Sequence, residues 1–221
     1  MNELICTVDL VLLTLKDDGL KVALLKRDHD PFKGVLSLPG GYIHADEDAD
    51  ARDAALRVLR VKTGIESPYL EQLATFSGSA RDPRGWSISV AYYALVSADV
   101  IERASHPDVQ LLSVDRPLNL PFDHRQIVET AVARLRSISQ YSSLPCHLLG
   151  ETFTLPQLQR VYETLMGEAL NKVSFRRKIF EMGMLEAIAG KFGASGAHRP
   201  AQLYRLKPEL RERLTLLQRG L

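Results

Sequence analysis

The hydrophobic pattern of the chain changes near residue 150, and this change limits the possible folds more than any other feature. Before it, short runs rich in Val, Leu, Ile and Tyr alternate with helical segments. After it, two closely spaced amphipathic helices precede two strand-like runs. A length of 221 residues suits one domain of ~140 residues and a smaller one. The sequence therefore predicts a first domain over 1–140, a linker over 141–152 and a second domain over 153–221.

The first domain is predicted to be α+β, with two helices on a mixed sheet. The helices are expected over 53–62 and 122–140, and apolar residues of the second recur at i, i+4 and i+8. Lys-Asp-Asp-Gly at 16–19 indicates a hairpin between the first two strands. The strands are expected at 5–15, 20–27, 73–79, 87–97 and 109–114. Such a layered arrangement differs from a Rossmann fold.

The second domain has the element order of a winged helix-turn-helix. Thr154 and Gln157 form the Thr-x-x-Gln pattern of a capping box, which predicts a helix that ends at Gly167. Ser174 is expected to cap a second helix, which stops at Gly183. Two strands joined by a Gly- and Ser-rich loop follow and predict the wing. The buried stripe of the first helix is predicted to consist of Leu158, Val161, Tyr162 and Leu165.

The second domain also carries most of the positive charge. Residues 151–221 contain 4 Lys and 8 Arg against 7 Glu, a net charge of +5 in a chain whose total is +1. Arg176, Arg177 and Lys178 follow one another near the expected start of the second helix. The helix dipole disfavours cations there, so a bound anion would stabilise them. The alternatives are a chance asymmetry of charge and a solvated basic face on a protein–protein module.

These features predict contacts with double-stranded DNA. The start of the second helix in a helix-turn-helix meets base edges in the major groove, where arginine pairs with guanine. Basic residues of the wing would contact phosphates or a minor groove. The predicted DNA-binding residues are Lys172, Ser174, Arg176, Arg177, Lys178, Lys191, His198 and Arg199.

Cysteine usage and hydropathy predict a cytoplasmic protein. Cys6 and Cys146 lack metal-ligand spacing and are expected to be reduced thiols, with a disulfide as the alternative. No apolar run approaches the ~20 residues that a membrane span needs. The N-terminus also lacks the pattern of a signal peptide.

A glycine-rich stretch at 40–65 resembles the Nudix box, G-x5-E-x7-R-E-U-x-E-E-x-G-U, where U is a bulky aliphatic residue. Gly41, Glu47, Arg57 and Gly64 match its frame, and a Glu47–Arg57 pair is expected to brace the loop. In the Nudix family, the glutamates after the arginine hold Mg²⁺ against a nucleoside diphosphate. Hard cations of this kind need oxygen ligands.

The stretch departs from the box at its metal-binding positions. Nine residues separate Glu47 from Arg57, where the box has seven. Val58, Val61 and Lys62 stand where the box has glutamates. Neighbouring aspartates at 46, 48, 50 and 53 could replace the lost ligands, but acids in a loop and first helical turn more often serve the helix dipole. The sequence therefore predicts no metal site, no cofactor and no catalysis.

Across nearly its whole length, the chain resembles the Nudix-related transcriptional regulators of NAD metabolism, the NrtR family. The resemblance rests on the altered box and on several further stretches: "RDHDPFKGVLSLPGG", "SARDPRGWSISVAY", "PFDHRQIVE", "FTLPQLQRVYE", "SFRRK" and "HRPAQLYRL". It implies a Nudix-like α/β/α sandwich followed by a winged helix-turn-helix. It also implies a homodimeric repressor of NAD biosynthesis or salvage genes, bound to a palindromic operator and released by ADP-ribose or a related nucleotide.

Several residues are candidates for the effector pocket. Guanidinium groups suit a diphosphate, and aromatic rings stack on an adenine. Asp123 could bind ribose hydroxyls or cap a helix, and His124 could bind the ligand or lie on the surface. Trp86 and Phe122 could instead pack in the core. The predicted effector-binding residues are Phe32, Gly41, Arg81, Asp82, Arg84, Trp86, Asp123 and His124.

Two other functions remain open from the sequence. The first is hydrolysis of ADP-ribose or a nucleoside diphosphate, which requires metal ligands outside the usual positions. The second is regulation by a sugar in a protein of the same architecture.

Overall fold

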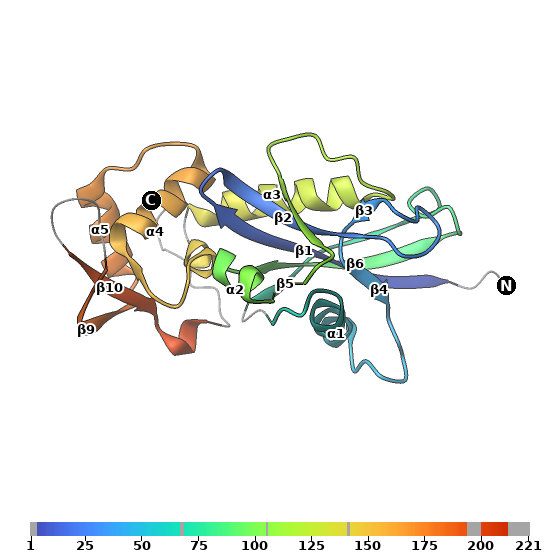
Figure 1. The fold of residues 1–221 in the computed structure, drawn as a ribbon, viewed down its shortest axis with the longest axis horizontal. Coiled ribbons are helices and arrows are strands. Elements are labelled where there is room, and N and C mark those ends of the chain that lie inside the picture. Colours follow the sequence, from blue (N-terminus) through green and yellow to red (C-terminus); the bar gives the residue numbers. More distant parts are fainter. Residues whose placement is uncertain (1–3, 67–68, 105, 141, 194–199, 212–221) are drawn as a thin grey trace.

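The computed structural model describes residues 4–66, 69–104, 106–140, 142–193 and 200–211. The molecule is elongated, with the sheet-based first domain at one end and the winged helix at the other (Figure 1). The N-terminus lies at the end of the first domain that is farther from the winged helix.

A seven-stranded mixed sheet forms the centre of the first domain. Its strands are β1 (Ile5–Lys16), β2 (Gly19–Lys26), β3 (Leu36–Ser37), β4 (Gly40–Tyr42), β5 (Leu70–Gly78), β6 (Ser87–Leu95) and β7 (Val109–Ser113). The main order is β3-β2-β1-β6-β5, with β4 paired to β1 and β7 to β2. The long strand β1 pairs in parallel with β6 along nine residues and turns back into β2 through the predicted hairpin.

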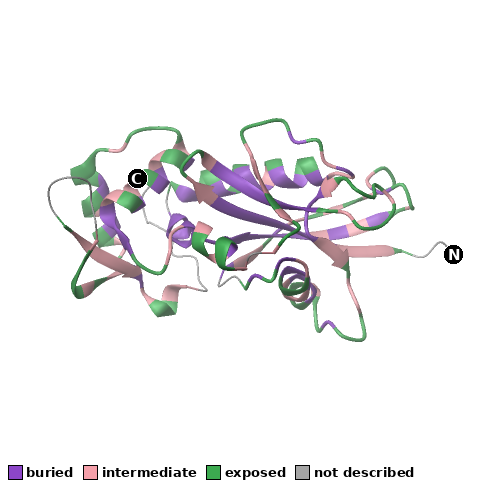
Figure 2. Cartoon of the chain, viewed as in Figure 1, coloured by how far each residue is buried: buried purple, intermediate pink, exposed green. Residues whose placement is uncertain are grey.

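Helices cover both faces of this sheet. The alternation of side chains along β1 sends Leu10 and Leu12 toward α1 (Ala51–Thr63) and α2 (Ala98–Ala104). Val11 and Leu13 face α3 (His124–Ser139) on the other side. Buried residues accordingly run through the strands in Figure 2. The predicted sandwich with a mixed sheet is confirmed. The sequence prediction omitted α2 and the two short strands β3 and β4.

The second domain has the predicted order of helix, turn, helix, strand and strand. Its elements are β8 (Phe153–Thr154), α4 (Leu155–Met166), α5 (Lys172–Glu181), β9 (Leu185–Gly193), β10 (Ala201–Leu206) and the 3₁₀ helix η2 (Pro208–Leu210). The capping box of Thr154 and Gln157 is present, and Gly167 ends α4 in the left-handed conformation. All four residues of the predicted stripe on α4 are buried.

The start of α5 differs from the prediction. Asn171 caps the helix, because its side-chain oxygen accepts hydrogen bonds from the backbone N–H groups of Val173 at 3.1 Å and Ser174 at 3.0 Å. Ser174 therefore lies inside the first turn, and the expectation that it caps the helix is wrong. Arg176 and Arg177 lie beyond that turn, where the helix dipole acts only weakly on charges, and Lys178 lies in the last turn, where the dipole favours a cation. Lys172 is the cation at the helix start.

A buried 3₁₀ helix, η1 (Leu144–Leu148), lies within the predicted linker and joins the two domains. Leu144 and Leu148 pack into the core beneath α3, whereas Cys146 packs into the core of the winged helix. The hydroxyl of Tyr162 on α4 donates a 2.6 Å hydrogen bond to the backbone oxygen of Ser142. The segment is thus part of both cores.

Both cysteines are free thiols, as expected. Cys146 is buried, and this burial raises its pKa to about 12. Its thiol is therefore protonated at neutral pH and behaves as a small apolar side chain.

His147 of η1 gives the domain joint a pH dependence. His147 is 8% exposed, and its ring centroid lies 4.9 Å from that of Tyr69. Burial, together with the positive charge of Arg211, lowers the pKa of His147 to about 4. An unfolded histidine titrates near 6.5, so protons bind the unfolded chain more strongly. The stability that neutral His147 contributes is present above pH ~6.5 and is lost as pH falls toward 4.

We expect the free energy of unfolding to fall by about 3 kcal/mol between pH 7 and pH 4 because of this residue. Urea titrations of the wild type and of His147→Phe across this range measure the effect. The phenylalanine keeps an aromatic ring but binds no proton, so the variant is expected to lose less stability on acidification. Equal losses in the two proteins would contradict the assignment.

Candidate functional site

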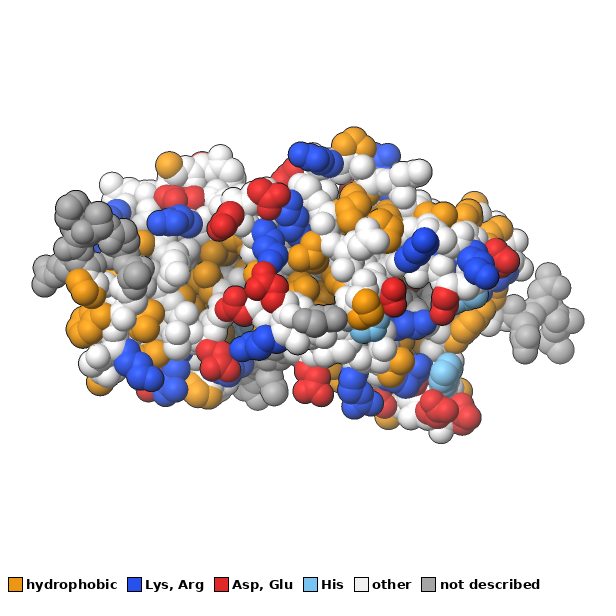
Figure 3. All heavy atoms as spheres, viewed as in Figure 1, with side chains coloured by type: hydrophobic (Ala, Val, Ile, Leu, Met, Phe, Trp, Pro, Cys, Tyr) orange, Lys and Arg blue, Asp and Glu red, His pale blue; other side chains and the backbone are white. Residues whose placement is uncertain are grey.

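A cavity of about 650 Å³ opens beside the glycine-rich loop that joins β3 to α1. Its lining comes from β1, the end of β2 and the segment after it, β3, the glycine loop, α1, the β5–β6 loop, the segment before β7 and the start of α3. Of the predicted effector-binding residues, Gly41, Arg81, Asp82, Arg84 and His124 contribute to this lining. Basic, acidic and histidine side chains mix on the part of this domain visible in Figure 3.

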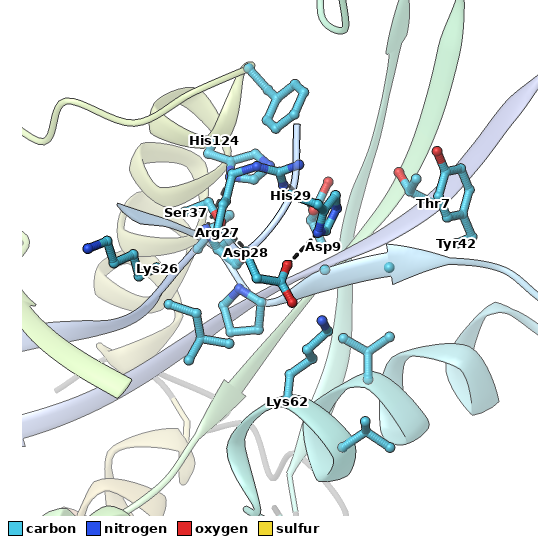
Figure 4. Close-up of a pocket in the computed structure, with 18 of the residues that line it drawn as sticks. Thr7, Asp9, Lys26, Arg27, Asp28, His29, Ser37, Tyr42, Lys62 and His124 are labelled. Atoms are coloured by element: carbon cyan, nitrogen blue, oxygen red, sulfur yellow. Dashed lines mark hydrogen bonds and ion pairs between the residues drawn. The ribbon is translucent and has the colours of Figure 1, made fainter. Parts of the chain in front are cut away.

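A buried carboxylate, Asp9, forms the floor of the cavity and is 6% exposed (Figure 4). One of its oxygens accepts a 2.6 Å hydrogen bond from Ser89 Oγ and lies 3.4 Å from Arg81 Nη2. The other lies 3.4 Å from His124 Nε2. Burial alone would raise the pKa of Asp9, but His124, the Ser89 hydrogen bond and the Arg81 charge together hold it below its usual value.

The tautomer of His124 follows from its hydrogen bonds. Its Nδ1 accepts a 3.1 Å bond from the backbone N–H of Leu38, which can only donate. The proton of the neutral ring is therefore on Nε2, which faces Asp9. His124 is 4% exposed, so it lies in the pocket floor and not on the surface.

Arg81 and Asp123 bind each other. Arg81 Nε and Nη2 each lie 2.9 Å from an oxygen of Asp123, and the side chain of Arg81 is 7% exposed. Asp123 stands at the N-cap of α3 but makes no side-chain cap hydrogen bond. The arginine thus ties the β5–β6 loop to the start of α3. The expected contacts of Arg81 with a diphosphate and of Asp123 with ribose stay predictions, since both groups already have protein partners.

Arg84 is likewise engaged by a neighbouring acid. Its Nε and Nη2 lie 3.0 and 2.7 Å from the carboxylate of Asp82, which is 4% exposed. Nη1 donates a 2.6 Å bond to the hydroxyl of Tyr42. The Arg84 guanidinium also lies 5.5 Å from the centre of the Tyr42 ring. The Arg84–Asp82 pair lies at one rim of the cavity.

The aromatic candidates lie in different places. Phe32 is 41% exposed and makes an edge-on contact with Phe122, with ring centroids 4.9 Å apart. Phe122 lines the cavity, whereas Phe32 is not among the residues of the lining. Trp86 is 49% exposed, so it does not pack in the core, and it lies outside the cavity lining. The stacking roles of Phe32 and Trp86 stay predictions that this geometry does not support directly.

Arg27 lines the cavity and was absent from the sequence prediction. Its guanidinium lies 5.0 Å from the centre of the Phe122 ring, and its Nε donates a 2.8 Å bond to the backbone oxygen of Pro31. Nη2 is buried without a hydrogen-bond partner among the described residues. Arg27 begins the stretch RDHDPFKGVLSLPGG, from which only Phe32 and Gly41 were selected as pocket residues, and the folded structure shows that Arg27 faces the pocket as well.

The glycines of the loop are required by close contacts. A Cβ at Gly40 would lie 2.4 Å from Asp9 Oδ1 and 3.0 Å from the backbone oxygen of Val8. A Cβ at Gly41 would lie 3.0 Å from Val58 Cγ2. The loop therefore passes directly over both the pocket floor and helix α1. Gly64 ends α1 in the left-handed conformation with a φ of 66°.

The prediction that Glu47 pairs with Arg57 is wrong, because Arg57 binds the neighbouring Asp48. Arg57 Nε and Nη2 each lie 2.7 Å from an oxygen of Asp48, and Nη2 also donates to the backbone oxygen of Tyr42 at 2.9 Å. The turn at 44–48 points the Asp48 carboxylate inward. Glu47 remains exposed and lies 3.2 Å from His44 Nδ1. The hydrogen bond from Arg57 lowers the pKa of Asp48 to about 2.

The other acids near the loop serve the helix. Asp50 caps α1 by accepting a 2.8 Å bond from the backbone N–H of Asp53. Asp53 in turn accepts from the backbone N–H of Ala49 at 3.2 Å. Within the described ranges, no group of three or more His, Cys, Asp or Glu residues is arranged to hold a metal ion.

The predicted DNA-binding residues of α5 are placed on an open surface. Lys172, Ser174, Arg176 and Arg177 are exposed, and the buried side of the helix is formed by Phe175 and Ile179. Arg177 lies 3.8 Å from Glu181 one turn later, and both side chains remain largely exposed. Lys178 is half-buried, Lys191 is exposed on β9, and His198 and Arg199 lie outside the described residues.

The helices in the described part of the chain lack the combination of length and apolar composition that a bilayer crossing requires.

Comparison with known proteins identifies both domains. The NUDIX domain family matches residues 7–131, and the NrtR DNA-binding winged helix domain family matches residues 145–206. The ADPR-responsive transcriptional repressor NtrR of Acinetobacter baylyi is 39% identical over 208 residues, covering 90% of this chain and 80% of the relative.

Two solved structures are similar as well. The Shewanella oneidensis NrtR structure in complex with a 27mer DNA has a TM-score of 0.89 at 40% identity, covering 98% of this chain and 99% of that one. The NUDIX domain of the same protein in complex with ADP-ribose has a TM-score of 0.54 at 41% identity, covering 61% and 90%. The predicted Nudix-like fold followed by a winged helix is confirmed.

The Asp48–Arg57 pair predicts unequal effects of two neighbouring substitutions. Asp48→Asn removes the inward carboxylate that holds Arg57, so we expect it to lower the melting temperature at pH 7. Glu47→Gln changes an exposed side chain of the same turn and is expected to leave the melting temperature unchanged. Thermal unfolding of the two variants measures the difference. A larger drop in melting temperature for Glu47→Gln than for Asp48→Asn would contradict the Asp48–Arg57 pair and favour the Glu47–Arg57 pair.

Proposed function

Since the chain belongs to the NrtR family of transcriptional regulators, we propose that it is a transcriptional repressor released from its operator by ADP-ribose. The observation that carries the proposal is the presence in one chain of an exposed basic helix α5 and a cavity with an unpartnered Arg27 Nη2. Relatives that match both domains include a repressor responsive to ADP-ribose and a protein solved with DNA.

The DNA-binding part of the proposal rests on α5 and β9. The exposed face of α5 presents Lys172, Arg176 and Arg177 away from the winged-helix core. In a helix-turn-helix such a face enters the major groove, and arginine pairs with guanine there. We propose that the protein acts in the cytoplasm as a homodimer on a palindromic operator, because two symmetric copies read two symmetric half-sites. The resemblance to the family supports the proposal that this operator lies near genes of NAD biosynthesis or salvage.

The effector part rests on the cavity of the first domain. Arg27 and Lys62 supply positive charge, and Phe122 supplies an aromatic face. This combination suits a nucleotide with a diphosphate. We propose that ADP-ribose binds here without being hydrolysed, since Val58, Val61 and Lys62 offer no carboxylate at the positions of the box glutamates.

A DNA-binding assay with and without effector tests the proposal. Fluorescence anisotropy of a labelled operator fragment gives the affinity, and ADP-ribose is expected to weaken it at least tenfold. Free pentoses and NAD serve as comparison compounds. Specific binding that responds to a sugar and not to ADP-ribose would favour the sugar-regulated alternative. The absence of specific DNA binding would remove the repressor function altogether.

Incubation of the protein with ADP-ribose and Mg²⁺ or Mn²⁺ tests the hydrolase alternative. We expect no release of AMP, measured by chromatography, at protein concentrations that saturate the operator. Turnover that disappears in Glu47→Gln would instead show a working hydrolase that uses ligands outside the usual positions.

We expect Arg177→Ala to weaken operator binding at least tenfold without changing the affinity for ADP-ribose. The side chain is exposed on α5 and makes only a 3.8 Å contact with Glu181. Arg125→Ala is a matched control, because Arg125 lies 2.8 Å from Glu129 with the same i,i+4 spacing on α3 of the other domain. Equal losses in both variants would indicate a general charge effect. An unchanged affinity of Arg177→Ala would place recognition on the wing.

A further inference from the structure

The α1 side of the cavity cannot supply the oxygen ligands that the Nudix fold implies for a divalent metal. Val58 is 2% exposed and fills the space beneath Gly41. Val61 is exposed and lines the cavity with an apolar side chain. The third position carries Lys62, a cation that would repel Mg²⁺. The residues present therefore do not fit the metal.

The carboxylates elsewhere in the lining do not make up for this loss. Asp9 and Asp82 are held by arginines and by further hydrogen bonds, so much of their charge is balanced within the protein. Asp28 follows β2 and is bound to His29, whereas Asp108 lies on the separate loop before β7. A Mg²⁺ site needs oxygen ligands that converge on one point. Within the described residues these acids do not form such a group.

Two cations instead point into the cavity. Lys62 extends from α1 and Arg27 comes from the opposite side, as Figure 4 shows. Lys62 forms no contact ion pair with a described residue, although its charge helps to lower the pKa of Asp28. Arg27 keeps a buried Nη2 without a hydrogen-bond partner among the described residues. A buried donor of this kind is costly unless a ligand accepts its hydrogen bond.

The positive charge of Arg27 is disfavoured mainly by burial of its side chain. Burial lowers the pKa of its guanidinium, and the like charge of Arg84 lowers it further. The nearby acids Asp28, Asp82 and Asp9 act in the opposite direction and do not cancel the effect. An anion at this point would relieve both the repulsion and the missing hydrogen bond.

Building on the proposed effector, we infer that Lys62 and Arg27 take over the charge-neutralising role of the divalent metal, so that the diphosphate of the nucleotide binds without any metal ion. The ammonium and the guanidinium are fixed parts of the chain, whereas a metal would have to bind first. A diphosphate diester carries one negative charge on each phosphate, and the two cations offer one positive charge each. Effector affinity then depends on residue 62 and not on free Mg²⁺.

Isothermal titration of the full chain with ADP-ribose, in EDTA and in millimolar MgCl₂, tests this inference. We expect the wild-type dissociation constants in the two buffers to agree within about twofold. Lys62→Gln is expected to weaken binding in EDTA by about tenfold, or ~1.4 kcal/mol. Lys62→Glu is expected to weaken it further through repulsion, and Arg27→Gln to weaken it through loss of the buried donor.

Arg60→Gln is the control, because it removes a positive charge from the same helix at an exposed position outside the cavity lining. We expect this variant to bind ADP-ribose like the wild type. Operator affinity without effector shows that each variant is folded. Loss of wild-type binding in EDTA, or unchanged binding by Lys62→Gln, would overturn the inference while leaving the repressor function in place. A wild type that binds no ADP-ribose in either buffer would overturn the proposed effector as well.

Discussion

The contact between the Asp9 carboxylate and the glycine loop determines the arrangement of the whole cavity. Asp9 lies in the middle of β1, buried between sheet and loop, and Gly40 passes so close that no other residue fits. A buried carboxylate needs partners to remain charged. Ser89, Arg81 and His124 provide them, and they come from β6, the β5–β6 loop and α3. One acid therefore connects the pieces of chain that form the pocket floor.

Charge balance divides the cavity into two parts. Arg81 in the floor and Arg84 at the rim each have a carboxylate partner within 3 Å, so these groups mainly hold the structure together. Around the opening, Arg27 and Lys62 lack such a contact with the described residues. The distinction matters because a guanidinium that already binds an acid must give up that bond to meet a phosphate. Sequence alone shows four basic residues and does not reveal which are engaged.

The features that the sequence predicted correctly depend on residues close together in the chain. The hairpin after β1, the capping box before α4 and Gly64 at the end of α1 each involve only a few neighbouring positions. The errors involve a choice between equivalent partners. Glu47 and Asp48 are both acids within reach of Arg57, and the turn at 44–48 decides between them. Asn171 and Ser174 are both good caps, and the helix starts at the first. Arg27 joins the site only through the folded sheet.

The two-sided burial of η1 connects the cores of the two domains. Leu144 and Leu148 complete one core, while Cys146, two residues from Leu148, completes the other. A cut anywhere within this short helix would expose apolar surface on both fragments. A winged helix from a relative is therefore expected to replace this one only if residues 142–149 still pack against both domain cores. A change of sequence in η1 is therefore constrained by the packing of both domains at once.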